Sequence, residues 1–198
     1  GKSVDVCVDL GGRRIMKKAT GLGATAAWSA EGDQAGAYFG WSVASAGDIN
    51  NDGYGDVLVG YYGWDGTYVD EGRVQLYLGS AAGLSPTFNW FYTGGQAGAQ
   101  AGYAVASAGD VNGDGYADFL VGAPGFDNGQ TDEGRAWLFL GGANGVPTLA
   151  WTGESDQAGA GYGISAAGAG DVDNDGYDDV LIGADLYDDV VTDGGRVY

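Results

Sequence analysis

The stretch that decides the fold is Asp48-Ile49-Asn50-Asn51-Asp52-Gly53-Tyr54-Gly55-Asp56. It returns as Asp110-Val111-Asn112-Gly113-Asp114-Gly115-Tyr116-Ala117-Asp118 and again as Asp171-Val172-Asp173-Asn174-Asp175-Gly176-Tyr177-Asp178-Asp179. The copies begin at residues 48, 110 and 171, so they lie 62 and 61 residues apart. Each copy reads D-x-[ND]-x-D-G-Y-x-D, with a carboxylate or amide side chain at positions 1, 3, 5 and 9 and a glycine at position 6.

This spacing is typical of a loop that binds a hard cation. Calcium takes roughly six to eight oxygen ligands from carboxylates, amides, backbone carbonyls and water. The glycine at position 6 permits a sharp turn, and the tyrosine at position 7 would offer its backbone carbonyl. Without a cation, the acidic side chains would repel one another. The sequence therefore predicts three Ca²⁺ sites, whose ligands are Asp48, Asn50, Asp52, Tyr54, Asp56; Asp110, Asn112, Asp114, Tyr116, Asp118; and Asp171, Asp173, Asp175, Tyr177, Asp179.

The motif has two other interpretations, an EF-hand and a surface turn without metal. An EF-hand requires a bidentate Glu at position 12 and flanking helices. Position 12 is apolar in all three copies (Val59, Val121 and Ile182), and the flanks are strand-like. The other alternative is an Asx/Gly surface turn that binds no metal. Three copies in register favour the metal loop over this turn.

The repeat extends beyond the loop. Trp28, Trp90 and Trp151 keep the same steps, and so does a series of Gln, Gly and Arg residues. The second repeat contains four strand-sized segments, at 102–109, 118–122, 134–141 and 148–151. Four antiparallel strands in about 60 residues predict a β-propeller blade. We therefore expect an all-β chain of about 3–3.5 blades, comprising a partial blade at 1–27, repeats at 28–89 and 90–150, and an incomplete repeat at 151–198.

Each repeat carries two further short motifs, a dipeptide before the acidic loop and a tripeptide after it. Phe39-Gly40, Ala101-Gly102 and Tyr162-Gly163 precede the loop, and Gly60-Tyr61-Tyr62, Gly122-Ala123-Pro124 and Gly183-Ala184-Asp185 follow it. In this order the chain resembles the FG-GAP repeats of integrin α-subunits. The resemblance implies a calcium-bearing β-propeller, a non-enzymatic module that serves in adhesion or surface assembly.

Composition excludes several classes of function. The formal net charge is −19, which disfavours nucleic-acid binding because that needs a basic face. No run approaches about 18 apolar residues, so no membrane insertion is expected. The chain contains no His, which rules out His-dependent catalytic triads, and its single cysteine, Cys7, excludes an internal disulfide. Weak calcium sites fill only where calcium is millimolar, so we expect an extracellular or secreted protein.

Three and a half blades do not close a ring, so either the sequence is a piece of a longer chain or several chains join. The expected partners are other protein chains, above all copies of the same chain. Strand pairing at the open edge near Tyr198 would join them head to tail. The alternative function is lectin-like binding of glycans by the aromatic residues of the first repeat's long loop, against ordinary packing of that loop; these residues are Tyr61, Tyr62, Trp64 and Tyr68.

Catalysis is disfavoured because the repeat already explains most of the paired carboxylates as metal ligands. Asp188 and Asp189, next to Asp185, are the acids that the repeat explains least. The expectation is that the chain is not an enzyme.

Overall fold

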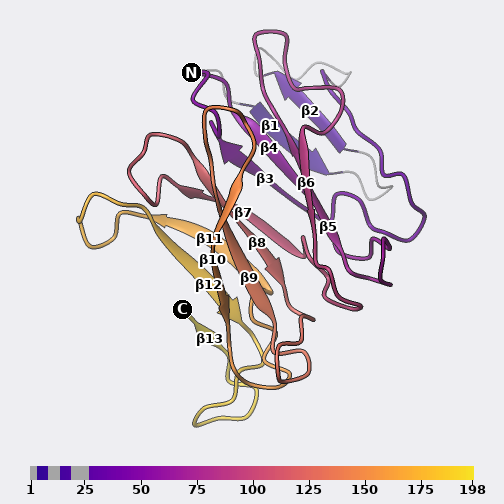
Figure 1. Cartoon of the computed structure of the whole chain (residues 1–198), viewed down its shortest axis with the longest axis vertical. Coiled ribbons are helices and arrows are strands. Elements are labelled where there is room, and N and C mark those ends of the chain that lie inside the picture. Colours follow the sequence, from indigo (N-terminus) through magenta and orange to yellow (C-terminus); the bar gives the residue numbers. More distant parts are fainter. Residues whose placement is uncertain (1–3, 9–13, 19–26) are drawn as a thin grey trace.

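The computed structural model describes residues 4–8, 14–18 and 27–198, and these residues form antiparallel sheets without a helix (Figure 1). Strands β1 (Val4–Val8) and β2 (Arg14–Lys18) make a two-stranded sheet. Both strands lie within the segment 1–27 that is expected to be a partial blade, and Cys7 lies in β1. The rest of that segment falls almost entirely outside the described residues, so the partial blade remains a prediction.

Two complete four-stranded sheets follow. The first contains β3 (Ser42–Gly47), β4 (Asp56–Tyr61), β5 (Arg73–Tyr77) and β6 (Trp90–Thr93) in that spatial order. The second contains β7 (Ala104–Gly109), β8 (Asp118–Ala123), β9 (Arg135–Leu140) and β10 (Thr148–Glu154). The third sheet has β11 (Ser165–Gly170), β12 (Asp179–Ala184) and β13 (Arg196–Val197). The predicted all-β fold with blades of four antiparallel strands is confirmed.

The sheets overlap the sequence repeats with an offset. Strand β6 begins at Trp90, the first residue of the second repeat, yet it pairs with β5 of the first sheet. The two four-stranded sheets therefore each combine most of one repeat with the start of the next. The repeat boundaries expected from the sequence, at 28–89, 90–150 and 151–198, remain a prediction.

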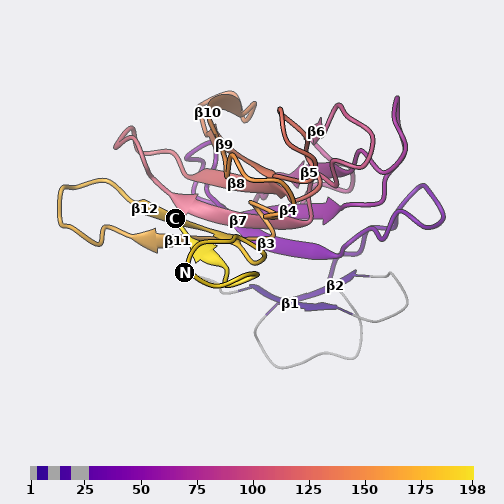
Figure 2. The same cartoon turned by 90° about the horizontal axis from the view of Figure 1, so that it is seen from below.

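The sheets stack face to face, and the apolar core lies between them (Figure 2). Every residue of β4 and of β8 is buried, because both faces of these middle strands are covered. Side chains alternate between faces along a strand, so Leu58 packs toward the second sheet while Val57 and Val59 pack in a separate cluster with Phe39. The first strands β3, β7 and β11 lie side by side, as the inner strands of neighbouring propeller blades do.

Glycines allow adjacent blades to approach closely at the two recurring dipeptide and tripeptide positions. A Cβ placed on Gly60 would lie 2.1 Å from the carbonyl oxygen of Gly102, and one on Gly122 would lie 1.9 Å from that of Gly163. Gly102 also has a positive φ of 81° and donates its N–H to the carbonyl of Gly122 at 3.1 Å. The motif glycines are thus required by backbone packing between blades.

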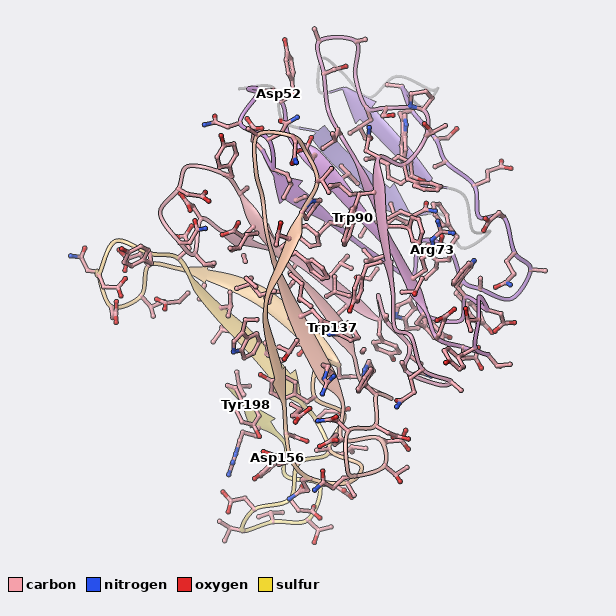
Figure 3. The ribbon with its side chains drawn as sticks, in the orientation of Figure 1. Asp52, Arg73, Trp90, Trp137, Asp156 and Tyr198 are labelled. Carbon is pink, nitrogen blue, oxygen red and sulfur yellow. The ribbon has the colours of Figure 1, made fainter. Side chains whose placement is uncertain are left out.

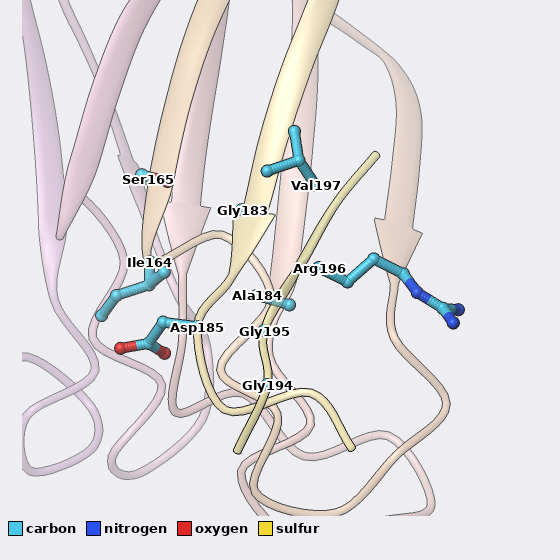
Figure 4. A pocket seen from close by; sticks show the side chains of 9 residues that line it. All are labelled: Ile164, Ser165, Gly183, Ala184, Asp185, Gly194, Gly195, Arg196 and Val197. Carbon is cyan, nitrogen blue, oxygen red and sulfur yellow. The ribbon is translucent and has the colours of Figure 1, made fainter. Parts of the chain in front are cut away.

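Gly183 in β12 is the counterpart of Gly60 and Gly122. A pocket beside it is lined by Ile164, Ser165, Gly195 and Arg196 among other residues (Figure 4). In the first two sheets the corresponding surface is covered by the next blade's glycine segment, through the bridges Gly72–Ala101 and Gly134–Tyr162. The pocket is therefore the blade-stacking surface of the third sheet.

Candidate metal centres

The three acidic loops connect β3 to β4, β7 to β8 and β11 to β12. A β-bulge precedes each loop, where the register shifts at a glycine with a positive φ: Gly47, Gly109 and Gly170. The predicted turn at position 6 is confirmed, because Gly53, Gly115 and Gly176 have φ values of 87°, 87° and 96°. The loops therefore curl as the motif requires.

Position 4 of the motif is a structural requirement that the sequence reasoning missed. It is occupied by Asn51, Gly113 and Asn174, whose φ values are 54°, 72° and 61°. Asn and Gly are the residues that adopt this left-handed conformation at least cost. Their recurrence at position 4 was the signal that could have revealed this second turn.

The first aspartate of each loop organises the backbone. Asp48 accepts hydrogen bonds from the N–H groups of Asp52, at 3.0 Å, and Gly53, at 2.7 Å. Equivalent bonds reach Asp110 and Asp171, with distances between 2.8 and 3.1 Å. The side chains at positions 1 and 3 both accept the N–H of position 5, so the acidic groups are drawn to the inside of the curl.

In the first two loops the aspartate at position 9 is buried and joins the loop to the sheet, whereas Asp179 of the third loop is half-buried. Asp56 is 1% exposed and accepts the N–H of Ile49 at 2.8 Å and that of Gly79 at 2.7 Å. Asp118 does the same with Val111 and Gly141. Burial raises the pKa of Asp56 to about 6 against the lowering effect of these backbone hydrogen bonds, and the nearby Asp48 and Asp52 carboxylates add to the rise.

The ligand groups converge in the third loop. Asp171, Asp173 and Asp179 each offer one carboxylate oxygen, and these oxygens lie within 4.8 Å of one another. Oxygens bonded to one calcium ion at about 2.4 Å lie no more than about 4.8 Å apart, so the three carboxylates fit a single ion. The first two loops have Asn50 and Asn112 at position 3, where an amide oxygen replaces the carboxylate.

Position 5 lies close to position 3. In the first loop the Asn50 amide donates a hydrogen bond to the Asp52 carboxylate at 3.1 Å, and Asn112 does the same to Asp114 in the second. Asp175 is not part of the convergent trio of the third loop. The carboxylates of the first two loops do not form such a trio among the described residues. Metal binding by all the predicted ligands of the three loops, including the carbonyls of Tyr54, Tyr116 and Tyr177, remains a prediction. Figure 3 shows the first of these loops at the end of the molecule marked by Asp52.

The aromatic residues considered for glycan binding divide between the interior and the surface. Tyr61 is fully buried and hydrogen-bonded to Gln75, and the Trp64 ring lies under the Arg73 guanidinium at 4.8 Å. Tyr62 instead belongs to an exposed aromatic cluster, defined here as Tyr38, Trp41, Tyr62 and Tyr103. Tyr38 and Tyr62 stack with ring centroids 5.0 Å apart and an interplanar angle of 6°.

The acids left unexplained by the repeat have structural partners. Asp188 receives the Gln157 amide on its carbonyl at 2.8 Å, and its carboxylate accepts the N–H of Asp193. Gln34 with Asp65 and Gln96 with Asp127 form the same arrangement in the other repeats. Asp189 pairs with Arg196 at 2.8 Å. These aspartates hold the long loops, which removes the motive for assigning them a catalytic role.

Comparison with known proteins agrees with this geometry. The family model for the FG-GAP repeat matches residues 39–77, 101–139 and 155–198. The chain is 39% identical over 163 residues to mouse (Mus musculus) integrin alpha-IIb, covering 77% of this chain and 15% of the relative. It is 34% identical over 175 residues to integrin alpha-5 of Xenopus laevis, covering 83% and 16%. It is 35% identical over 167 residues to integrin alpha-8 of Gallus gallus, covering 77% and 15%.

The chain therefore spans only 15 to 16% of the length of these relatives. The three family matches fall on the three larger sheets and together cover more than half of the 198 residues. Since sequence repeats, sheet order and motif glycines coincide, this chain belongs to the FG-GAP repeat family and has the integrin alpha-like β-propeller fold.

Proposed function

We propose that this chain is a non-enzymatic binding module, an adhesion-type propeller whose blades are braced by three calcium ions. The observation that carries the proposal is the convergence of Asp171, Asp173 and Asp179 in a loop that the chain repeats three times. Oxygen donors without nitrogen or sulfur favour a hard cation. Calcium would offset the repulsion between these carboxylates, and its binding free energy would stabilise the folded blades.

The proposed site of action is outside the cell. Loops of this kind fill at the millimolar calcium of extracellular fluid, and the integrin alpha relatives support an adhesion role. Within the described residues, no helix has the length and apolar character needed to cross a bilayer. The charge of −19 argues against nucleic acid as a partner.

Calcium removal tests the proposal. Each loop occupied at 100 times its dissociation constant would contribute about 2.7 kcal/mol, and 1 kcal/mol shifts the melting temperature of a domain this size by about 2–4 °C. We expect excess EGTA to lower the melting temperature by at least about 5 °C, with recovery on adding Ca²⁺ but not K⁺ at matched ionic strength. An unchanged melting curve would contradict the proposal that calcium braces the blades.

The proposed partners are protein chains, including copies of this chain joined by strand pairing at blade edges. Light scattering with calcium and with EGTA tests this assembly. Particles larger than one chain that dissociate in EGTA would support it, and a monomer in both conditions would contradict self-association.

Glycan binding is the second candidate function, and the exposed aromatic cluster favours it. Tyr38 and Trp41 are 58% and 52% exposed, so their faces are open to a sugar ring. We expect glycan-array binding to disappear in Trp41→Ala and to persist in Tyr68→Ala, a surface aromatic outside the cluster. Binding that is absent in the unmodified chain, or unaffected by Trp41→Ala, would reject this candidate.

A further inference from the structure

A second acidic cluster lies away from the three loops. Glu133, Glu154 and Asp156 each offer one carboxylate oxygen, and these three oxygens lie within 4.8 Å of one another. Glu133 lies two residues before the start of β9, Glu154 is the last residue of β10, and Asp156 lies two residues after it. In Figure 3, Asp156 lies at the opposite end of the molecule from Asp52, so this cluster is separate from the calcium loops.

Glu133 supplies the independent observation that points to a ligand. Its side chain is fully buried, and its Oε2 atom has no hydrogen-bond partner. Its other oxygen, Oε1, accepts the N–H of Asn128. A buried carboxylate oxygen without a partner is unfavourable, so native structures normally satisfy it with a donor, a water or an ion.

The first sheet shows how the same position is satisfied without an ion. Glu71 is the counterpart of Glu133, and it too is buried, at 2% exposure. Its Oε1 accepts the N–H of Thr67 at 2.7 Å, and its Oε2 accepts that of Gly95 at 3.2 Å. Both oxygens of Glu71 are thus occupied by backbone donors, as expected of a purely structural carboxylate.

The second sheet differs from the first at two further positions. The strand registers place Glu154 opposite Arg135 where the first sheet has Thr93 opposite Arg73. Asp156 stands where the first sheet has Gly95, and both residues have a positive φ, 58° and 69°. Compared with the first sheet, Glu154 and Asp156 add two carboxylates beside the buried Glu133. The Oε2 atom of Glu133 also lacks the backbone N–H donor that Gly95 supplies to Glu71.

The charges of the cluster do not balance. Arg135 pairs with Glu154 at 2.5 Å, and Asn128 donates to both oxygens of the same carboxylate at 2.9 Å. With one guanidinium facing three carboxylates, two negative charges remain uncompensated among the described residues.

We propose that Glu133, Glu154 and Asp156 form a fourth divalent-cation site, specific to the second blade among those described, which takes Ca²⁺. Three carboxylate oxygens within 4.8 Å can share one ion at the calcium–oxygen distance of about 2.4 Å. The donor set contains oxygen alone, which suits a hard cation rather than zinc or copper. Water would complete the coordination on the exposed side of Asp156, and the ion would tie the end of β10 to the loop before β9.

Counting bound ions in matched variants tests the site. The variants are Asp156→Asn, the double variant Glu154→Thr/Asp156→Gly, which installs the residues of the first sheet, and Asp132→Asn as the control. Asp156 is exposed and its left-handed backbone accepts Asn, so the first variant is expected to fold. Asp132 lies next to Glu133 in the loop before β9, is exposed and has a φ of 50°. Its substitution removes the same charge as Asp156→Asn without changing any of the three carboxylates of the cluster.

Equilibrium dialysis with ⁴⁵Ca²⁺, supported by titration calorimetry, gives the number of ions per chain. We expect the double variant to bind one equivalent fewer than the unmodified chain, and Asp132→Asn to bind the same number with the same affinity. Asp156→Asn keeps an amide oxygen in place of a carboxylate, so we expect it to bind one of its ions more weakly. This difference of one ion is independent of how many ions the three loops hold. Equal stoichiometry and affinity in all four proteins, each with an unchanged circular dichroism spectrum, would overturn the proposal and assign the second oxygen of Glu133 to a buried water.

Discussion

Substituting Gly122 by alanine should separate the second and third blades. The added Cβ would lie 1.9 Å from the carbonyl oxygen of Gly163 and 2.9 Å from its carbonyl carbon. Real Cβ atoms essentially never come within 3.0 Å of such atoms, so the two sheets must move apart by about 1 Å at this point. Both positions belong to buried backbone, Gly122 in β8 and Gly163 in the turn before β11, and no flexible side chain can move aside to relieve the clash.

Overpacking of a well-packed core costs typically 1–3 kcal/mol, and the rigid surroundings of Gly122 place it in the upper part of that range. We expect Gly122→Ala to lower the free energy of unfolding by about 2–3 kcal/mol. In a domain of this size, that corresponds to a fall in melting temperature of about 4–12 °C. Differential scanning calorimetry in saturating calcium, and urea unfolding followed by tryptophan fluorescence, would measure the two quantities.

Gly55→Ala is the matched control. A Cβ at Gly55 would meet its nearest atom, the carbonyl oxygen of Gly47, at 3.9 Å, which is an ordinary contact. The second repeat already carries alanine at this motif position, Ala117. We expect the control to change stability by less than about 0.5 kcal/mol. The reasoning would be refuted if Gly122→Ala had the same melting temperature as the unmodified chain, or if both substitutions lowered it equally. Close backbone contact between blades would then not be the reason for glycine at position 122.

Three further predictions concern single side chains. Asp118→Asn leaves one of two buried N–H groups without an acceptor, so urea unfolding in EGTA should show a loss of about 1–3 kcal/mol, whereas Asp132→Asn should match the unmodified chain. Because burial raises the pKa of Asp56 to about 6, protons should compete with calcium, and calorimetric calcium affinity should fall as the pH drops through 6; equal affinities at pH 7 and pH 5.5 would contradict this. In EGTA the effect of pH on stability has the opposite sign. A raised pKa means that the folded state binds the proton more tightly than the unfolded state, so protonation of Asp56 stabilises the fold as the pH falls through 6. Gln96→Ala removes two hydrogen bonds to the backbone of Asp127 and should cost about 1–2 kcal/mol, with faster amide exchange at Asp127 as the specific sign of a loosened loop.

The acidic loops show what could be predicted from local spacing. Asp48 and Asp56 are eight residues apart, and the backbone between them has little freedom once Gly53 sets the turn. Loop position and fold class therefore followed from the order of residues, whereas strand ends did not, since β10 runs on to Glu154 beyond the expected end at residue 151. The turn at Asn51 was overlooked because asparagine at a single site has several uses, and only the recurrence at position 4 separates them.

Contacts between different repeats could not be predicted from local spacing. Tyr61 and Tyr62 are neighbours in the sequence, yet one enters the core and the other joins Tyr103 of the next repeat on the surface. Strand alternation predicts that adjacent side chains diverge, but not which face a neighbouring sheet will cover. Asp188 was similarly unexplained until its bond to Gln157, 31 residues away, was visible.

The sequence by itself determined the repeat, the four-stranded blade and the acidic loops, because each depends on residues within one strand or one turn. The tertiary structure alone decided that Gly122 must lack a side chain, that four aromatic rings from two repeats meet on one surface, and that Glu133 is buried with an unpaired oxygen beside two other carboxylates. The physical reason is that these features depend on how closely stacked sheets approach. That distance is set by the packing of every side chain between them and leaves no periodic trace along the chain.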